Sequence, residues 1–221
     1  VFLQNIEIGI ISVLFTVFCV IGLTNSFNFI DGVDGLSSGL ALIAILSVII
    51  ISYLENTLVY LIDLDYLILL SLTILYFMFF NITKFNKIFL GDSGSMFLGF
   101  FISWILIMAS QSENQIIHPI LTIWCVSLPV FDITSVVIRR SLRKINPFKP
   151  DRRHVHHILI EMGYGNFTTT LLILTLSIIL NFFGILIFYL SGPFMALFSF
   201  LVLLILYVIL MINLSRRIYI K

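Results

Sequence analysis

The stretch SGLALIAILSVIIISYL at residues 38–54 contains no charged side chain. A transmembrane α-helix needs roughly 20 predominantly apolar residues to cross the hydrocarbon core of a bilayer, and this stretch is close to that length. The polar segment NFIDGVDG at 28–35 precedes it, and a second apolar stretch at 8–27 comes before that segment. The pattern therefore predicts two membrane spans joined by a short acidic turn.

Apolar stretches of similar length recur along the rest of the chain. Hydrophobic residues make up 60% of the sequence and charged residues only 10%, whereas a soluble domain carries about 25% charged residues. The mean hydropathy of +1.16 agrees with this. Further spans are predicted at 66–82, 95–110, 117–138, 168–190 and 195–214. We therefore predict an all-α fold, a polytopic transmembrane helical bundle of about seven spans, with residues 1–221 in a single transmembrane domain.

The basic residues are confined to one side of this predicted bundle. All 12 Lys and Arg residues fall in loops or tails on that side, and the largest of these loops is 139–166. The opposite loops carry only the acids Glu55, Asp63, Asp65 and Glu113. Because loops rich in Lys and Arg stay in the cytoplasm, the asymmetry predicts an N-terminus outside and a C-terminus in the cytoplasm.

The acidic turn between the first two spans is the first of three polar clusters on the basic side. Asn28 and Asp31 are three residues apart, so they share a face at a helix end, and Asp34 follows closely. Carboxylate and carboxamide oxygens suit Mg²⁺, which prefers oxygen ligands and keeps several of its waters. The cluster is thus a candidate metal site, and the alternative is an ordinary helix-capping turn.

The second cluster is KIFLGDSGS at residues 87–95, which opens directly into an apolar span. Small residues at a helix start leave backbone N–H groups available for phosphate. Asp92 would repel a phosphate, so we interpret it as a metal ligand that bridges to phosphate. The alternative is a simple N-cap, and the missing Gly-Lys-Ser/Thr excludes a P-loop.

The third cluster is PFKPDRRHVHH at residues 147–157, in the largest basic loop. Its Pro-Asp pair predicts a turn into a helix, on which His154 and His157 would share a face. No Cys lies nearby to complete a zinc site, so anion binding is favoured. Attraction of the positive charge to anionic lipid is the alternative.

One acid, Asp132, falls inside the fifth predicted span, three residues after Pro129. Ionisable residues inside a membrane segment are costly and usually functional. Pairing with a nearby arginine such as Arg139 is the structural alternative.

The three clusters together resemble the polyprenyl-phosphate N-acetylhexosamine-1-phosphate transferases. The matching signatures, in order, are Asn28-x-x-Asp31-Gly-x-Asp34-Gly-Leu, Phe89-Leu-Gly91-Asp92-Ser-Gly94-Ser and Pro147-Phe-x-Pro150-Asp151-x-x-His154-x-His156-His157. The His-x-His-His form is similar to the bacterial undecaprenyl-phosphate N-acetylglucosamine-1-phosphate transferase branch. The resemblance extends over essentially the whole chain.

The resemblance implies transfer of N-acetylglucosamine-1-phosphate from UDP-N-acetylglucosamine to undecaprenyl phosphate, with release of UMP. It implies a Mg²⁺ cofactor, with Mn²⁺ as the substitute, and an active site on the cytoplasmic face of a bacterial inner membrane. The product would start a lipid-linked cell-envelope glycan, such as lipopolysaccharide or teichoic acid. Membrane lipid is a further expected partner, a homodimer is left open, and no nucleic acid is expected.

The resemblance also implies roles for individual residues. Phe89 would stack on the uracil, and the histidines would meet the sugar-phosphate. The implied catalytic residues are Asp31, Asp34, Asp92, His154, His156 and His157. The implied substrate-binding residues are Asn28, Asn81, Phe89, Arg152 and Arg153, and the implied metal ligands are Asp92, Asn28 and Asp31.

The sequence departs from the family pattern in one respect. Family members carry an Asp-Asp pair on an earlier cytoplasmic loop and have more spans, but no Asp-Asp occurs here. We therefore expect this chain to be the C-terminal portion of the enzyme, and an inactive fragment is one alternative. A related transferase for another UDP-N-acetylhexosamine is the second alternative. A transporter is the third, although that would predict charges along a mid-membrane pathway.

Overall fold

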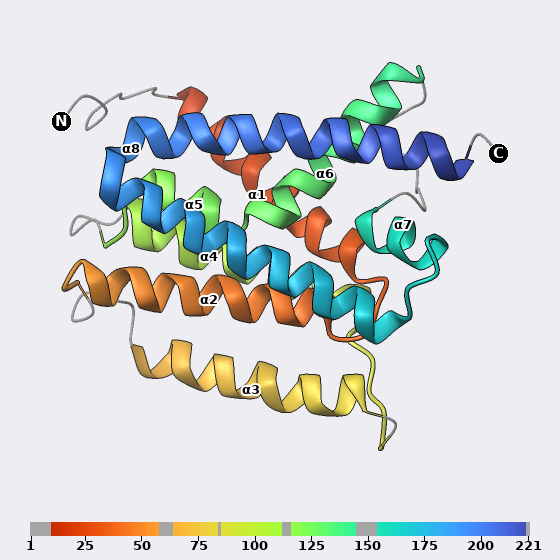
Figure 1. Ribbon diagram of the computed structural model, residues 1–221. Coiled ribbons are helices and arrows are strands. Elements are labelled where there is room, and N and C mark those ends of the chain that lie inside the picture. The colour runs from red at the N-terminus through yellow and green to blue at the C-terminus, as the bar shows by residue number, and fades with distance from the viewer. Residues whose placement is uncertain (1–9, 58–63, 84, 112–115, 145–153, 220–221) are drawn as a thin grey trace.

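The computed structural model describes residues 10–57, 64–83, 85–111, 116–144 and 154–219. Every regular element in these ranges is a helix, which confirms the all-α prediction (Figure 1). The helices are α1 Ile10–Ile30, α2 Leu36–Leu54, α3 Leu64–Ile82, α4 Gly91–Gln111, α5 Pro119–Cys125, α6 Ser127–Leu142, α7 Val155–Glu161 and α8 Asn166–Tyr219. The predicted loop 139–166 therefore begins inside α6 and contains the short helix α7.

Five of the described helices are long and apolar enough to cross a membrane. The predicted span 117–138 is not one straight helix, because α5 and α6 meet at an angle of 75°. Counting this bent pair as one span gives up to six. Several apolar helices of this kind make a multi-pass membrane protein, while the count of seven and the orientation of the termini stay predictions.

The longest helix, α8, reverses its direction partway along. A straight helix of 54 residues would be about 80 Å long, far more than the roughly 30 Å of a hydrocarbon core. Gly192 interrupts it with φ 82° and ψ 176°, and Pro193 follows. Figure 1 shows the consequence, which is that the second arm of α8 runs back toward the end where the first arm began.

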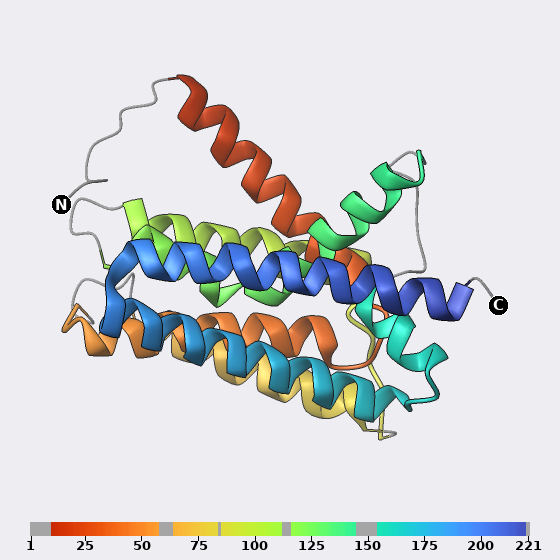
Figure 2. The same ribbon diagram turned by 45° about the horizontal axis from the view of Figure 1, so that its top comes forward.

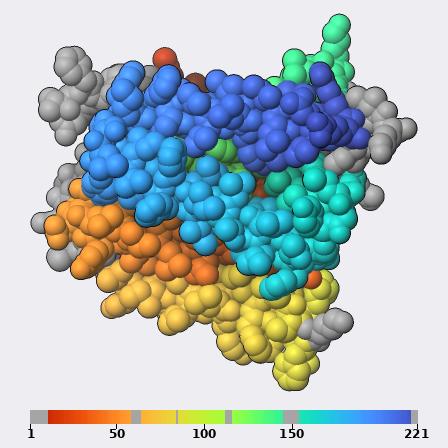
Figure 3. Space-filling model, viewed as in Figure 1, coloured from red at the N-terminus to blue at the C-terminus, as the bar shows by residue number. Residues whose placement is uncertain are grey.

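The centre of the bundle is α2. Of the apolar stretch of α2, 67% is buried inside the protein, against 22% for α1 and for α3. Thus α2 packs mainly against other helices, while α1 and α3 are mostly exposed. Figure 2 shows α1 diverging from the other helices toward its N-terminal end. In Figure 3 the two arms of α8 form the near face, with α2 and α3 beside them.

Close contacts fix the inner end of α1 against its neighbours. A Cβ at Gly99 on α4 would lie 2.8 Å from Thr24 Cα, so glycine allows the two backbones to approach. The Ser26 hydroxyl donates to the Pro129 carbonyl of α6 over 2.7 Å. These contacts hold the C-terminal part of α1, which leads into the acidic turn, against α4 and α6.

Candidate active site

The polar clusters lie at one end of the bundle, on the right in Figure 1, where α1 ends and α2 begins. The Asn28 amide on α1 donates to Ser95 Oγ in the first turns of α4 over 3.1 Å. Thr170 Oγ1 on α8 donates to the Asp34 carbonyl over 2.9 Å. Residues 67 and 136 positions apart in sequence are thus joined around the acidic turn.

The acidic turn is shaped by a glycine and an asparagine. Gly35 precedes α2 with φ 74°, a left-handed conformation that glycine adopts without strain. Its N–H donates to Asn81 Oδ1, while Asn81 Nδ2 donates to the Ile88 carbonyl over 2.8 Å. Asn81 is buried and uses both ends of its amide inside the protein. The structure therefore places this predicted substrate-binding residue as a brace between the acidic turn and the 85–90 segment.

Three carboxylates meet beside this turn. Burial of Asp31, together with the charges of Asp92 and Asp34, raises the pKa of the Asp31 carboxyl to about 6. Asp92 lies in the first turn of α4 and is exposed. In the described residues, no three His, Cys, Asp or Glu side chains are placed to hold a metal ion by themselves.

These observations still fit a hard cation. Mg²⁺ is usually held by one or two protein carboxylates together with substrate phosphates, rather than by a complete protein cage. Asn28 donates through its amide nitrogen, so its Oδ1 is the atom left to act as a ligand. The predicted ligands Asp92, Asn28 and Asp31 therefore have suitable chemistry, with coordination sites left for phosphate oxygens.

Lys87 and Phe89 lie on the exposed side of the carboxylates. Lys87 Nζ is 2.7 Å from Asp34 Oδ2 and 5.0 Å from the centroid of the Phe89 ring. Phe89 is 74% exposed, so its ring is accessible to lipid or to a ligand. Lys87 is missing from the residues that the sequence predicted, although its place two residues before Phe89 in the second motif could have indicated it.

The histidines differ strongly in their surroundings. His154 is buried at the N-cap of α7, and His157 is half-buried. His156 is fully buried, and neither of its ring nitrogens has a hydrogen-bond partner in the described structure. Burial, and next the neighbouring His157, lower the pKa of His156 to about 3, so it is neutral at physiological pH. The predicted ligands Arg152 and Arg153 lie outside the described residues.

The His cluster touches the acidic turn directly. A Cβ added to Gly32 would collide with His156 Nε2, so the imidazole packs where another residue would carry its side chain. The His156 and His157 rings lie 4.1 Å apart, and the Phe29 and His154 rings 5.6 Å apart. The first and third motifs therefore form one site.

Asp132 lies beneath this site on α6. His154 Nδ1 is 2.7 Å from Asp132 Oδ2, and the Val155 N–H donates to Asp132 Oδ1 over 3.0 Å. The Tyr207 hydroxyl on α8 donates to Oδ1 over 3.4 Å. Arg139, the partner considered from sequence, directs its Nε to the Ser135 carbonyl of its own helix.

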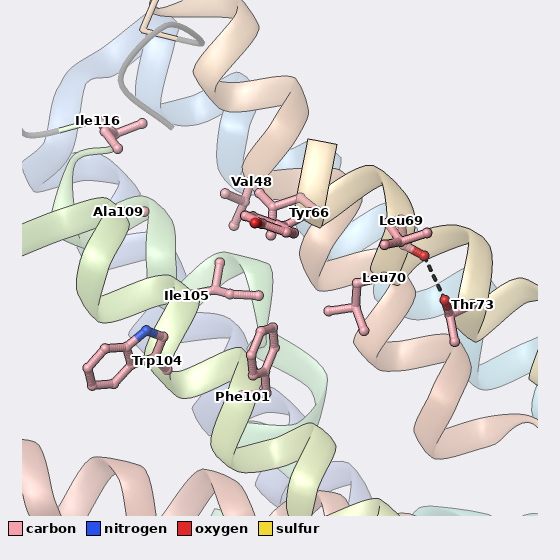
Figure 4. Close-up of a pocket in the computed structure, with 11 residues that line it drawn as sticks. Val48, Tyr66, Leu69, Leu70, Thr73, Phe101, Trp104, Ile105, Ala109 and Ile116 are labelled. Carbon is pink, nitrogen blue, oxygen red and sulfur yellow. Dashed lines mark hydrogen bonds between the residues drawn. The ribbon is translucent and has the colours of Figure 1, made fainter. Parts of the chain in front are cut away.

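A separate apolar cavity of about 360 Å³ lies between α2, α3 and α4 (Figure 4). Its lining includes Val48, Tyr66, Phe101 and Trp104, and none of the lining residues is charged. The Thr73 hydroxyl beside it donates to its own helix at Leu69. This cavity offers no positive charge to hold a diphosphate, so the candidate active site is the polar end of the bundle.

The comparison with known proteins agrees with this assignment. Residues 1–110 match the family described as glycosyl transferase family 4. The chain belongs to this family. Its membership confirms the resemblance that the three motifs predicted.

Individual relatives carry more specific names. The chain is 33% identical over 178 residues to a probable undecaprenyl-phosphate N-acetylglucosaminyl 1-phosphate transferase of Bacillus subtilis (strain 168), covering 80% of this chain and 49% of the relative. It is 29% identical over 171 residues to the undecaprenyl-phosphate alpha-N-acetylglucosaminyl 1-phosphate transferase of Escherichia coli (strain K12), covering 77% and 47%. The relative of the same name from Yersinia pestis is 29% identical over 173 residues, covering 77% and 47%. The chain spans about half the length of the curated relatives it matches.

Proposed function

We propose that the full-length protein transfers N-acetylglucosamine-1-phosphate from UDP-N-acetylglucosamine to undecaprenyl phosphate. The names of the relatives supply the acceptor and the transferred group. The observation that carries the proposal is the meeting of three motifs around one acidic turn, through the contacts Asn28–Ser95, Lys87–Asp34 and Gly32–His156. The active site would face the cytoplasm of a bacterial inner membrane, since the basic loops lie on that side.

In the proposed reaction, an oxygen of undecaprenyl phosphate attacks the sugar-linked phosphorus of the donor. The bond between the two donor phosphates breaks, and UMP leaves with the bridging oxygen. A phosphate monoester has a second pKa near 6, so the acceptor is mostly dianionic at neutral pH and needs little help from a general base. The demand on the protein is to bring two anions together.

The residues of the site meet this demand in different ways. Lys87 supplies positive charge to the nucleotide phosphates, and Phe89 offers an exposed ring for stacking on the uracil. His154 would accept a hydrogen bond from the sugar through Nε2, because its Nδ1 carries the proton that faces Asp132, and His157 would donate to the sugar-phosphate. Asn81 holds the acidic turn in place rather than contacting the donor.

Asp92, Asp31 and Asn28 would hold a Mg²⁺ ion, or Mn²⁺ in its place. When bound, this ion supplies positive charge that offsets the repulsion between the phosphates. The raised pKa of Asp31 supports this assignment, because burial of its carboxyl, and next the charges of Asp92 and Asp34, disfavour its charged form without a cation. Asp34 is engaged by Lys87 and stands beside the ion rather than among its ligands.

The direct test uses the full-length protein in nanodiscs with undecaprenyl phosphate. UMP release is measured with UDP-N-acetylglucosamine, UDP-N-acetylgalactosamine or UDP-glucose as donor, with Mg²⁺ and with a chelator. We expect UMP and a lipid diphosphate sugar in equal amounts, only with metal, and fastest with UDP-N-acetylglucosamine. Preference for another N-acetylhexosamine donor would change the sugar, and the absence of product with every donor would refute a transferase.

The histidine cluster gives a second test of the donor. His154→Ala should weaken binding of UDP-N-acetylglucosamine and leave UMP, which lacks the sugar, far less affected. Loss of one hydrogen bond costs about 0.5–1.5 kcal/mol, or roughly two- to tenfold. An equal loss for both ligands would assign the cluster to general phosphate binding.

A further inference from the structure

Asp132 belongs to none of the three motifs, yet its carboxylate has three hydrogen-bond partners. It is 1% exposed, and its carboxylate meets His154, Val155 and Tyr207. These partners come from α7 with its N-cap and from α8, while Asp132 itself comes from α6, the second helix of the bent pair. One buried carboxylate thus ties three elements together beneath the candidate active site.

The two carboxylate oxygens have different partners. Oδ1 accepts from the Val155 N–H and from the Tyr207 hydroxyl, and Oδ2 is 2.7 Å from His154 Nδ1. A carboxylate can only accept, so the His154 Nδ1 must carry the proton in this contact. In the neutral ring the other nitrogen, Nε2, then carries no proton and can accept a hydrogen bond from a hydroxyl or N–H group of a ligand.

We propose that Asp132 is a positioning residue, which fixes the tautomer and the ring orientation of His154 and docks the N-terminus of α7 against the bent helix pair. Its role in turnover rests on the proposed function, because His154 is the residue assigned to the sugar-phosphate. Its effect on the tautomer of His154 follows from the contacts alone. Asp132 itself touches no reacting atom.

The substitution Asp132→Asn gives a sharp prediction. The Val155 N–H and the Tyr207 hydroxyl both need an acceptor, so the amide oxygen of Asn takes the Oδ1 position. The amide nitrogen then faces His154 Nδ1, which must become an acceptor. His154 should therefore switch to the tautomer protonated at Nε2, although the size and packing of the side chain are kept.

The test is ¹⁵N NMR of histidine-labelled full-length protein in nanodiscs, with the His154 signal assigned by its loss in His154→Gln. In the unmodified protein, His154 should carry a hydrogen-bonded proton on Nδ1, and in Asp132→Asn that proton should move to Nε2. Tyr207→Phe should leave the proton on Nδ1, because its bond to Asp132 is the longest of the three. The matched control is Ser135→Ala, which removes a hydroxyl bonded to the Asp132 backbone carbonyl and leaves the carboxylate untouched.

A kinetic measurement on the same variants accompanies the NMR. We expect Asp132→Asn to lower kcat for the N-acetylglucosamine donor by about a hundredfold or more, as expected for a wrong tautomer, with UMP affinity unchanged. Asp132→Glu keeps the acceptor oxygens and should recover part of the rate.

The outcomes separate the two proposals. Failure of the unmodified protein to release UMP would refute the proposed function and leave the NMR result intact. An Nε2 proton on His154 in the unmodified protein, a result that needs no variant to fold, would overturn the positioning role. The same conclusion would follow if Asp132→Asn kept the proton on Nδ1, or if Ser135→Ala lowered the rate equally.

Discussion

Two acidic side chains, Asp132 and Asp31, lie at the same end of the bundle and differ in their hydrogen bonding. Asp132 is fully buried and has three hydrogen-bond donors. Asp31 is half-buried beside Asp34 and Asp92, and its carboxylate accepts no hydrogen bond from the residues that the structure describes. A buried carboxylate normally costs free energy unless it is paired, so the first group is satisfied by the protein and the second is not.

This difference distinguishes a carboxylate that holds the fold together from carboxylates that are placed to bind a ligand. A carboxylate whose partners are protein groups holds elements in place, as Asp132 does. Carboxylates that repel one another and lack protein donors are ready to bind something positive, and Asp31 and Asp92 are such a pair within the residues that the structure describes. If this distinction is right, removing charge at the two places should affect activity, packing and stability differently.

The largest expected effect comes from Asp92→Asn in the full-length protein. The side chain keeps its size but loses the charge that would hold Mg²⁺, so UMP release should fall about a hundred- to a thousandfold. Its thermal stability should not change, because Asp92 is exposed. Asp65→Asn, the same change in the first turn of α3, is the control. Near-normal turnover of Asp92→Asn at low Mg²⁺ would remove Asp92 from the metal ligands.

The second effect tests the contact between the acidic turn and the His cluster. In Gly32→Ala the new methyl group collides with His156, so we expect a loss of about 1–3 kcal/mol in stability and a clear fall in activity. Adding His156→Ala opens the space and should recover stability but not activity. Gly165→Ala, where nothing lies within 4 Å of the added Cβ, is the control. Equal stability of Gly32→Ala and Gly165→Ala would mean that the turn and the imidazole do not pack in solution.

These contacts also show what the sequence could and could not predict. Uncharged stretches such as 38–54 report a membrane helix because burial in lipid demands apolar side chains, and motif spacing placed Asp31 and Asp92 near helix ends. The hydropathy of a stretch does not show whether its helix is straight or bent, however. The bend between α5 and α6 was therefore not predicted. The reversal at Gly192 fell between two predicted spans for the simple reason that Gly and Pro interrupt the apolar pattern there.

Contacts between side chains that are distant in sequence could not be predicted for a different reason. Asp132 and His154 are 22 residues apart, and nothing in either segment specifies that they meet. Arg139 was the nearer partner in sequence, but it lies about two turns, or roughly 10 Å, farther along the same face of α6, where its Nε donates to the Ser135 carbonyl. The burial of His156 was equally hidden, because a His-x-His-His motif reads as polar while its middle histidine packs against Gly32.

A smaller effect, on UMP binding, is expected from substitution of Lys87, which pairs with Asp34 and would also contact a phosphate of the ligand. A partly exposed ion pair such as Lys87–Asp34 is worth about 0–1 kcal/mol, so a phosphate can replace Asp34 as the partner of the ammonium. Lys87→Gln should therefore weaken UMP binding about three- to tenfold, with thermal stability unchanged. Isothermal titration at two salt concentrations measures this, and the loss should shrink at high salt. Unchanged UMP affinity would leave Lys87 as a surface residue.

The smallest expected effect is the change in folding stability that Asp31→Asn causes when no metal is present. The pKa of Asp31 in the folded protein is about 6, above its ordinary value of 3.8, so the folded state binds the proton more tightly than the unfolded state. The resulting stability is present below about pH 4 and is lost as the pH rises through about 6. Above that pH the charged Asp31 side chain destabilises the folded state, and a neutral Asn would not.

Asp31→Asn should therefore be slightly more stable than the unmodified protein at pH 7.5 in a chelator. After allowance for solvent screening we expect about 1 kcal/mol or less, or roughly 2–4 °C in the thermal midpoint. The gap should disappear near pH 4 and narrow when Mg²⁺ is added, because the cation stabilises only the carboxylate. At Asp132 the opposite sign is expected, since Asn there loses the acceptor oxygen that faces His154 Nδ1. A gap at Asp31 that is independent of both pH and Mg²⁺ would show that its charge is as well satisfied as that of Asp132, and the contrast between the two acids would be wrong.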